Sequence, residues 1–149
     1  MNIREMKQED TQQVLDMMRI FYDSPAVIHK APDEILLRDI EDSIGDNPYI
    51  EGYVLEENGT VAGYSMLARS YSTEYGGLCV WIEDIYIKPE YQGHGMGAQF
   101  FEYIHDLYKD KAVRFRLEAE EDNVNAVRLY KRCGYSELPY MQLTRELED

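Results

Sequence analysis

The sequence predicts an α/β fold: a single domain over residues 1–149 whose mixed, mostly antiparallel sheet of about seven strands carries helices on both faces. Three observations support this prediction. Strand-like and helix-like segments follow one another in the order β-α-α-β-β-β-α-β-α-β-β. Asn58-Gly59, the dipeptide most typical of a tight hairpin, separates two segments rich in strand formers. Several segments place apolar residues at helical spacing, so each can bury one face against a sheet.

In the first half of the chain, two helices are predicted between strands. Asp10 is placed to cap the first helix, which ends near Pro25. The second helix begins after Pro32 and ends at Gly45, a residue type typical of helix C-termini. The expected elements of this half are a strand at 2–6, helices at 10–24 and 32–44, and strands at 49–56 and 60–68.

The second half alternates strands and helices. A long strand rich in β-branched and aromatic residues is interrupted by Glu83 and Asp84 and must end before Pro89. The last helix begins after Asp122 or Asn123 and closes at a glycine. The expected elements are strands at 78–87 and 113–119, helices at 97–108 and 123–134, and two short final strands at 135–137 and 141–147.

The net negative charge of the chain limits the kinds of molecule that it is expected to bind. It has 15 Lys and Arg against 29 Asp and Glu, a formal net charge of −14. Binding to nucleic acid depends on Lys and Arg that neutralise phosphates, so we expect no nucleic-acid partner. The same charge would attract small cations and polyamines, and it would equally well serve solubility alone.

No targeting, membrane or metal signal is evident. Residues 1–8 lack the basic and apolar regions of a secretory signal, and the longest apolar run, Leu78–Ile82, is far shorter than the roughly 20 residues that span a bilayer. Cys79 and Cys133 lie far apart, without metal-binding spacing. We therefore expect a cytoplasmic protein with reduced thiols, no metal site and no membrane partner.

A glycine-rich segment carries the clearest functional signal. Gln92-Gly-His-Gly-Met-Gly97 lies between a predicted strand and a predicted helix. Glycines allow a tight turn and close approach of a ligand, and the free amide groups at a helix N-terminus favour an anion. The segment therefore predicts a phosphate-binding loop, although it is not a Walker loop because no Gly-Lys-Ser/Thr follows.

Two other interpretations of this loop remain open. Gly93, Gly95 and Ala98 also satisfy G-x-G-x-x-A, the dinucleotide-binding pattern of Rossmann folds. Against a Rossmann fold, residues 88–92 separate the strand from the glycines, and only one parallel crossover is predicted. The loop could also be a glycine-rich turn without a ligand.

Two motifs resemble those of the GCN5-related N-acetyltransferases. Residues 81–97 are similar to the family's coenzyme A signature, Arg/Gln-x-x-Gly-x-Gly/Ala, which here begins at Gln92. Residues 123–135 are similar to its second motif, with its Asn, its Ala, a Leu-Tyr pair and a Gly-aromatic end. The family more often has Arg in place of Gln92, so this chain lacks one cation near the pyrophosphate.

The resemblance implies acetyl-CoA as co-substrate. Amide groups of the glycine-rich loop would bind its pyrophosphate, and its pantetheine arm would run like an extra strand in a gap between the strand that contains residues 85–87 and the strand at 113–119. Asn123 would hydrogen-bond the arm. The implied cofactor-binding residues are Ile85, Tyr86, Ile87, Gln92, Gly93, His94, Gly95, Met96, Gly97, Ala98, Asn123, Ala126 and Tyr130.

Acetyl transfer to an amine needs a base and an acid. An alkyl amine with a pKa of about 10.4 is almost fully protonated at neutral pH. The resemblance favours Glu83 as the base, acting directly or through water, while alternation puts Asp84 on the opposite face. It also implies that Tyr130 protonates the thiolate leaving group. Alternatively, both carboxylates pair with Arg114 or Arg116, and Tyr130 is only a core aromatic.

These residues together predict an acetyl-CoA-dependent N-acetyltransferase that transfers acetyl directly to a primary amine. A small cationic amine fits the acidity best, and a protein Lys or N-terminal amine is the alternative acceptor. His29, in the loop between the first two helices, and Asp84 are the candidate substrate-contacting residues. A non-catalytic coenzyme A sensor and an NAD-dependent oxidoreductase are the competing classes, and the resemblance allows a homodimer.

Overall fold

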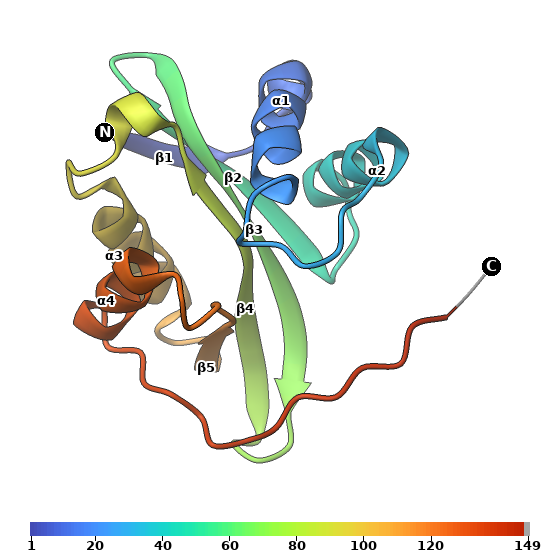
Figure 1. Cartoon of the computed structure of the whole chain (residues 1–149), viewed down its shortest axis with the longest axis vertical. Coiled ribbons are helices and arrows are strands. Elements are labelled where there is room, and N and C mark those ends of the chain that lie inside the picture. The colour runs from blue at the N-terminus through green and yellow to red at the C-terminus, as the bar shows by residue number, and fades with distance from the viewer. Residues whose placement is uncertain (148–149) are drawn as a thin grey trace.

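The computed structural model describes residues 1–147 and has a mixed sheet between two layers of helices (Figure 1). Within this part of the chain the strands lie in the order β1-β2-β3-β4-β5, antiparallel except for the parallel β4–β5 pair. The elements are β1 (Asn2–Glu5), η1 (Gln8–Asp10), α1 (Thr11–Tyr22), α2 (Asp33–Ile44), β2 (Ile50–Glu57), β3 (Thr60–Ser72), β4 (Gly77–Ile87), η2 (Pro89–Tyr91), α3 (Met96–Tyr108), β5 (Ala112–Leu117) and α4 (Val124–Arg132).

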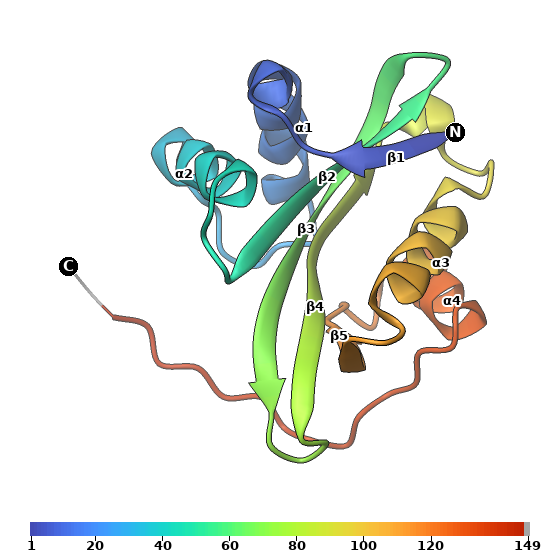
Figure 2. The ribbon, with the colours of Figure 1, turned by 180° about the vertical axis from the view of Figure 1, so that it is seen from behind.

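The helices cover both faces of the sheet, as the apolar stripes predict. α1 and α2 pack on one face, and α3 and α4 pack on the other (Figures 1 and 2). Val14 and Ile40 are fully buried between the first helix pair and the sheet, and Phe100 and Ile104 are fully buried on the opposite face. Burial of apolar surface on both faces fixes the sheet between the two helix pairs.

The predicted β2–β3 hairpin is confirmed. Asn58 and Gly59 have φ values of +52° and +78°, the two positive values that a type I′ turn requires. Glu57 pairs with Thr60 across the turn.

A β-bulge breaks the alternation expected along β4. Asp84 pairs with Met66 and Ile82 pairs with Leu67, so Glu83 has no partner on β3. Before the bulge, Ile82 packs in the core under α3. After it, Asp84 lies on the α1 side, where two tyrosines contact it. The bulge therefore decides which layer each carboxylate faces.

The prediction of two final strands was wrong. Residues 135–137 and 141–147 form no strand in the described structure, so the sheet has five strands rather than about seven. Tyr135 instead donates its backbone N–H to the Tyr130 carbonyl at 3.0 Å and ends α4, helped by Gly134 at φ +98°. A strand needs a neighbour to hydrogen-bond with, and residues 136–147 pair with none.

One helix-end prediction was wrong, and the predicted end of α2 at Gly45 is confirmed. Asp10 stands at the start of α1 but does not cap it, because η1 turns its carboxylate back toward Arg4 and the Lys7 N–H, both about 2.8 Å away. Gly45 follows α2 with φ −80°, so the turn there does not use the left-handed freedom of glycine. None of the helices in residues 1–147 is long and apolar enough to cross a membrane.

Candidate active site

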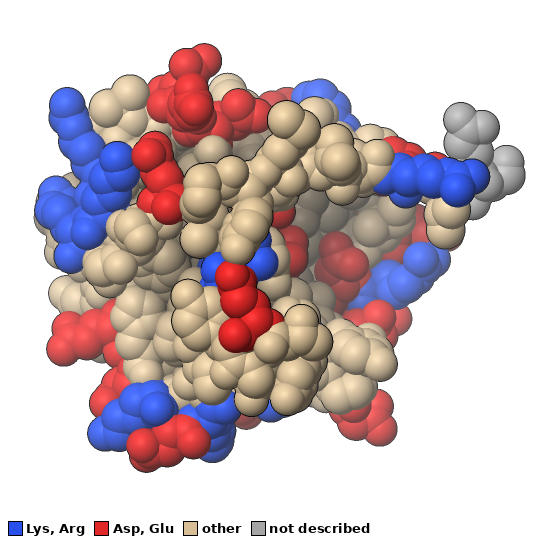
Figure 3. Space-filling view, turned by 90° about the horizontal axis from the view of Figure 1, so that it is seen from below, with Lys and Arg blue, Asp and Glu red and all other residues tan. Residues whose placement is uncertain are grey.

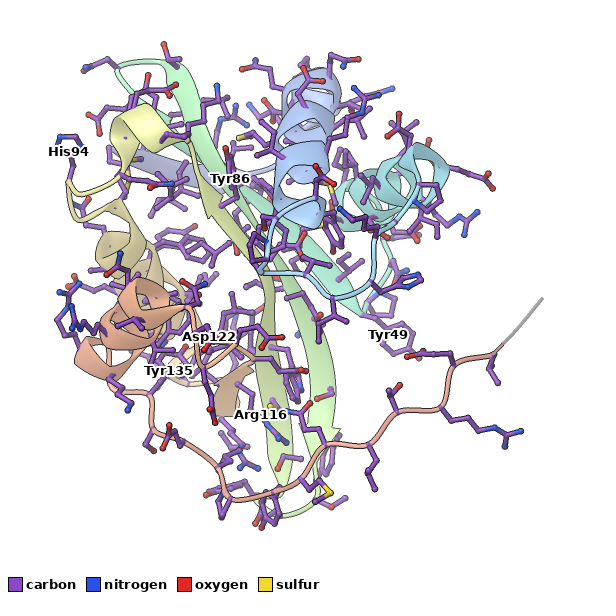
Figure 4. All side chains as sticks on the ribbon, viewed as in Figure 1. Tyr49, Tyr86, His94, Arg116, Asp122 and Tyr135 are labelled. Carbon is purple, nitrogen blue, oxygen red and sulfur yellow. The ribbon has the colours of Figure 1, made fainter. Side chains whose placement is uncertain are left out.

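The glycine-rich loop forms a set of free amide groups at the start of α3. Gly93 and Gly95 both have φ of +80°, a conformation that side chains with a Cβ disfavour. Among the described residues, the amide groups of residues 93–98 donate to no backbone carbonyl. His94 lies at the outer rim of this loop (Figure 4), with its ring 3.2 Å from the Tyr91 carbonyl. The loop therefore offers backbone N–H groups to an anion, as predicted.

Side-chain contacts hold this loop against its neighbours. The Gln92 amide donates to the Ile87 carbonyl at 2.8 Å and closes the end of β4. A Cβ on Gly97 would lie 2.8 Å from Leu129, so glycine there allows α4 to pack closely on α3. From the sequence Gly97 is predicted only as a residue of the ligand-binding loop, and the structure adds this packing role.

β4 and β5 separate where the site residues begin. The parallel pairing ends at Ile82 with Leu117. Beyond it β4 continues to Ile87, paired with β3 on one side, and on the other side no strand of residues 1–147 pairs with it. Because backbone groups alternate along a strand, Ile85 points its N–H and C=O toward this open edge. The gap matches the one implied for the pantetheine arm.

Asp84 is a buried carboxylate held by two tyrosines. Its side chain is 3% exposed. The hydroxyl groups of Tyr22 and Tyr64 donate to its two oxygens at 3.0 and 2.9 Å. Burial raises the pKa of Asp84 to about 7, although both hydrogen bonds lower it, and the nearby Glu83 and Asp39 add to the increase. Asp84 is therefore near its titration point at neutral pH.

Glu83 occupies the bulge at the mouth of the gap. Glu83 is an exposed residue, yet its pKa is raised. The larger cause is the desolvation of its carboxyl group by the surrounding protein, and the second is the nearby Glu118 carboxylate. Acidic side chains are visible inside a hollow of the surface beside the projecting C-terminal segment (Figure 3). The structure thus concentrates negative charge near the end of the β4–β5 pairing.

Tyr130 lies on α4, beside a hollow that β5 also lines. Its ring packs edge-on against Phe101 at 5.6 Å, and its side chain lines a hollow of about 1590 Å³ bounded by β5, α4 and the chain after α4. Burial raises the pKa of Tyr130. Glu118 lines the same hollow as Tyr130 and also raises the pKa of Glu83. It is therefore near both predicted catalytic residues.

The arginine pairing considered for the two carboxylates is not present. Arg114 donates to Glu74 at 2.9 Å and lies over the Tyr75 ring. It therefore contacts the loop between β3 and β4 and not the two carboxylates. Arg116 lies over the Trp81 ring at 4.4 Å. Within residues 1–147, neither Glu83 nor Asp84 takes part in an ion pair.

The remaining predicted residues lie as follows. Asn123 is exposed at the start of α4 and its side chain does not cap the helix, while Ala126 lies half-buried one turn on. His29 is exposed in the α1–α2 loop, and no side-chain hydrogen bond or ion pair within residues 1–147 involves it. No group of three His, Cys, Asp or Glu side chains in the described part of the chain is arranged to hold a metal ion.

Sequence reasoning missed the residues that surround the carboxylates. The sequence predicts no catalytic or acetyl-CoA-binding role for Tyr22, Tyr64, Asp39 or Glu118. Tyr22 and Asp84 are 62 positions apart, and no local pattern indicates their contact.

The residues present fit acetyl-CoA. A loop of free amide groups can hold a pyrophosphate, the open edge of β4 can pair with an amide-bearing arm, and a protonated tyrosine lines the hollow beside β5. A Rossmann site does not fit, because the sheet is antiparallel apart from one pair.

Comparisons with known proteins agree with this geometry. The sequence model of the Acetyltransferase (GNAT) family matches residues 14–135. Thialysine N-epsilon-acetyltransferase of Sus scrofa is 32% identical over 148 residues, covering 91% of this chain and 84% of the relative. Spermine/spermidine N(1)-acetyltransferase of Bacillus subtilis (strain 168) is 31% identical over 93 residues, covering 58% of this chain and 60% of the relative.

A solved structure has the same fold. Aminoglycoside N-acetyltransferase AAC(6′)-Iy, solved in complex with CoA, superposes with a TM-score of 0.80 at 14% identity, covering 97% of this chain and 93% of that one. The family model alone spans most of the sequence. The chain therefore belongs to the acetyltransferase (GNAT) family and is an N-acetyltransferase that uses acetyl-CoA to acetylate an amine.

Proposed function

We propose that this protein transfers acetyl from acetyl-CoA directly to the primary amine of a small cationic molecule, with Glu83 as base and Tyr130 as acid. The observation that carries the proposal is the separation of β4 and β5 immediately beyond the bulge that presents Glu83. This opening lies between a loop of free amide groups and a protonated tyrosine, so donor and acceptor can meet there without a covalent enzyme intermediate.

Each residue has a defined role in this proposal. Acetyl-CoA supplies the activated acetyl group when bound, with its pyrophosphate on the amide groups of residues 93–98. Glu83 removes a proton from the acceptor ammonium group, directly or through water, and its raised pKa improves it as a base. Tyr130 holds its proton at neutral pH and donates it to the leaving thiolate. The Ile85 N–H can stabilise negative charge on the acetyl oxygen.

A cationic acceptor is favoured by the charge of the site. The Glu118 carboxylate raises the pKa of Glu83, Glu83 in turn raises the pKa of Asp84, and the whole chain carries a net charge of −14. Such a field raises the local concentration of small cations. The relatives named for thialysine and for spermine and spermidine act on amines of this kind.

The test is CoA release, followed with a thiol reagent, from protein and acetyl-CoA offered a panel of polyamines, thialysine and other amino acids, aminoglycosides, amino-sugars and peptides. We expect release above the amine-free rate with a polyamine or an amino acid of similar charge. Release with Lys or N-terminal peptides alone would replace the proposed acceptor class. Bound acetyl-CoA with no release from any amine would favour a coenzyme A sensor instead.

A thermal-shift comparison distinguishes the proposed acetyltransferase from an NAD-dependent oxidoreductase. Acetyl-CoA at 100 times its Kd should stabilise the protein by about 2.7 kcal/mol, whereas NADH should have no effect. The reverse pattern would support an oxidoreductase and contradict the proposal.

A further inference from the structure

Asp84 is closed off from any substrate in the folded chain. The residue is 3% exposed, and Tyr64, one of the two tyrosines that bind it, is completely buried. Each of its carboxylate oxygens accepts a hydrogen bond from one tyrosine hydroxyl, Tyr22 at 3.0 Å and Tyr64 at 2.9 Å. An acceptor amine would have to displace one of these hydroxyl groups to reach the carboxylate. The substrate contact expected from the sequence therefore does not suit this geometry.

Three side chains from two other elements hold Asp84 in place. Tyr22 is the last residue of α1, and Tyr64 lies on β3. Ser65, which also lies on β3 and is completely buried, donates its hydroxyl to the backbone carbonyl of Asp84 at 2.7 Å. The side chain and the main chain of Asp84 are thus both fixed, and a rotation of this residue would leave buried polar groups without partners.

The residue held in this way adjoins the bulge of β4. The antiparallel pairing with β3 passes from Ile82 to Asp84 and omits Glu83. The parallel pairing with β5 ends at Ile82. Among residues 1–147, Glu83 therefore has no strand partner on either side, and its direction depends on the residues before and after it. Ile82 is anchored in the core under α3, and Asp84 is the anchor on the other side of the bulge.

A carboxylate at this position destabilises the folded chain. No Lys, Arg or His within residues 1–147 forms an ion pair with Asp84. The charged groups that act on it are two further carboxylates, Glu83 on β4 and Asp39 on α2. Burial of a charge without an opposite charge is unfavourable, and hydrogen bonds offset only part of this cost. A buried carboxylate that lowers stability, next to the proposed base, indicates a functional role.

We propose that Asp84 is a positioning residue that, together with Tyr22 and Tyr64, fixes the bulge of β4 and so directs Glu83 at the amine to be acetylated. This inference rests on the proposed role of Glu83 as the base. A general base has to lie within about 2.6–3.2 Å of its hydrogen-bonded partner, or reach it through one water. A displacement of about 1 Å can lower a rate about 10²-fold. Asp84 itself touches neither the acceptor nor the coenzyme.

Tyr64→Phe tests this role without altering either carboxylate. It removes one hydroxyl group that no substrate can reach. We expect kcat with an amine acceptor to fall about 10–100-fold while the KM for acetyl-CoA stays unchanged. Tyr53→Phe is the matched control, because the Tyr53 hydroxyl is also buried and donates to a carboxylate, that of Glu51, at 2.9 Å on the opposite face of the sheet. Equal losses in the two variants, or no loss in Tyr64→Phe, would contradict the inference.

A double-mutant cycle separates positioning of the base from contact with the acceptor. Glu83→Gln, Tyr64→Phe and the double variant are compared by kcat/KM. If the Tyr64 hydroxyl acts only through Glu83, its removal should cost nothing further in the Glu83→Gln background. Losses that multiply would overturn the inference. Wild-type activity of Glu83→Gln would overturn the proposed base as well, whereas a loss there beside an unaffected Tyr64→Phe would overturn the positioning role alone.

Carbon-13 NMR of labelled glutamate carboxyl groups gives a measurement that needs no acceptor. The surrounding protein and the Glu118 carboxylate raise the pKa of Glu83, so this pKa depends on where its side chain lies. The Glu83 signal is assigned by its absence from Glu83→Gln. In Tyr64→Phe the pKa of Glu83 should move toward the ordinary value of a glutamate, and in Tyr53→Phe it should keep its raised value. A raised pKa of Glu83 that persists in Tyr64→Phe would refute the positioning role whatever the protein acetylates.

Discussion

Replacement of Asp84 by Asn should remove a loss of stability that the wild-type protein suffers as the pH rises from 5 to 8. In the folded chain the carboxylate of Asp84 is almost completely buried, and burial raises its pKa from 3.8 to about 7. The unfolded chain keeps the lower value. Between these pKa values the folded state therefore binds more protons, and the free energy of unfolding falls as pH rises.

The size of the effect follows from the two pKa values. The full shift corresponds to roughly 4 kcal/mol, since one pKa unit is about 1.36 kcal/mol. Part of it is already lost at pH 5, because that pH lies above the unfolded pKa. Integration of the difference in bound protons from pH 5 to pH 8 gives a fall of roughly 2–3 kcal/mol in the free energy of unfolding of the wild type. The Asn side chain does not titrate, so Asp84→Asn should gain this amount relative to the wild type over that interval.

Urea unfolding at pH 5 and pH 8, followed by the fluorescence of Trp81, measures the effect. Loss of a hydrogen bond from Tyr22 or Tyr64 shifts the variant equally at both pH values and cancels in the comparison. Glu102→Gln, at an exposed carboxylate on α3, serves as the control and should differ from the wild type by the same amount at both. An Asp84→Asn difference that is equal at the two pH values, or larger at pH 5, would refute the reasoning.

Three further predictions concern the site and its support. Tyr130→Phe should lower kcat about 10²–10⁴-fold while leaving the Kd for CoA unchanged, and unchanged turnover would remove Tyr130 from the mechanism. Glu83→Gln should lower kcat/KM and abolish the fall in rate below the raised pKa of this carboxyl, because the base is protonated there; a pH–rate profile of wild-type shape in the variant would exclude Glu83 as the base. Gly97→Ala places a Cβ 2.8 Å from Leu129 and should cost about 1–3 kcal/mol in the free energy of unfolding, whereas a neutral effect would mean that α4 adjusts freely.

Much of the fold could be predicted because it is encoded in short stretches of sequence. The Asn58-Gly59 turn and the stripe containing Phe100 and Ile104 each depend on neighbours within a few positions, and the structure has them as expected. Residues 135–137 and 141–147 have a strand-like pattern too. They form no strand, because a strand also needs a partner edge, and local sequence does not specify one.

The chemistry of the site divides in the same way. The glycine-rich loop could be predicted from local sequence, because glycine is the residue type that readily adopts the positive φ observed at Gly93 and Gly95. The protonation of Asp84 depends instead on tertiary contacts. A bulge opposite β3 turns it toward α1, and hydroxyl groups 62 and 20 positions away in sequence meet it there. Burial and long-range contacts set a pKa, and both exist only once distant segments have packed together.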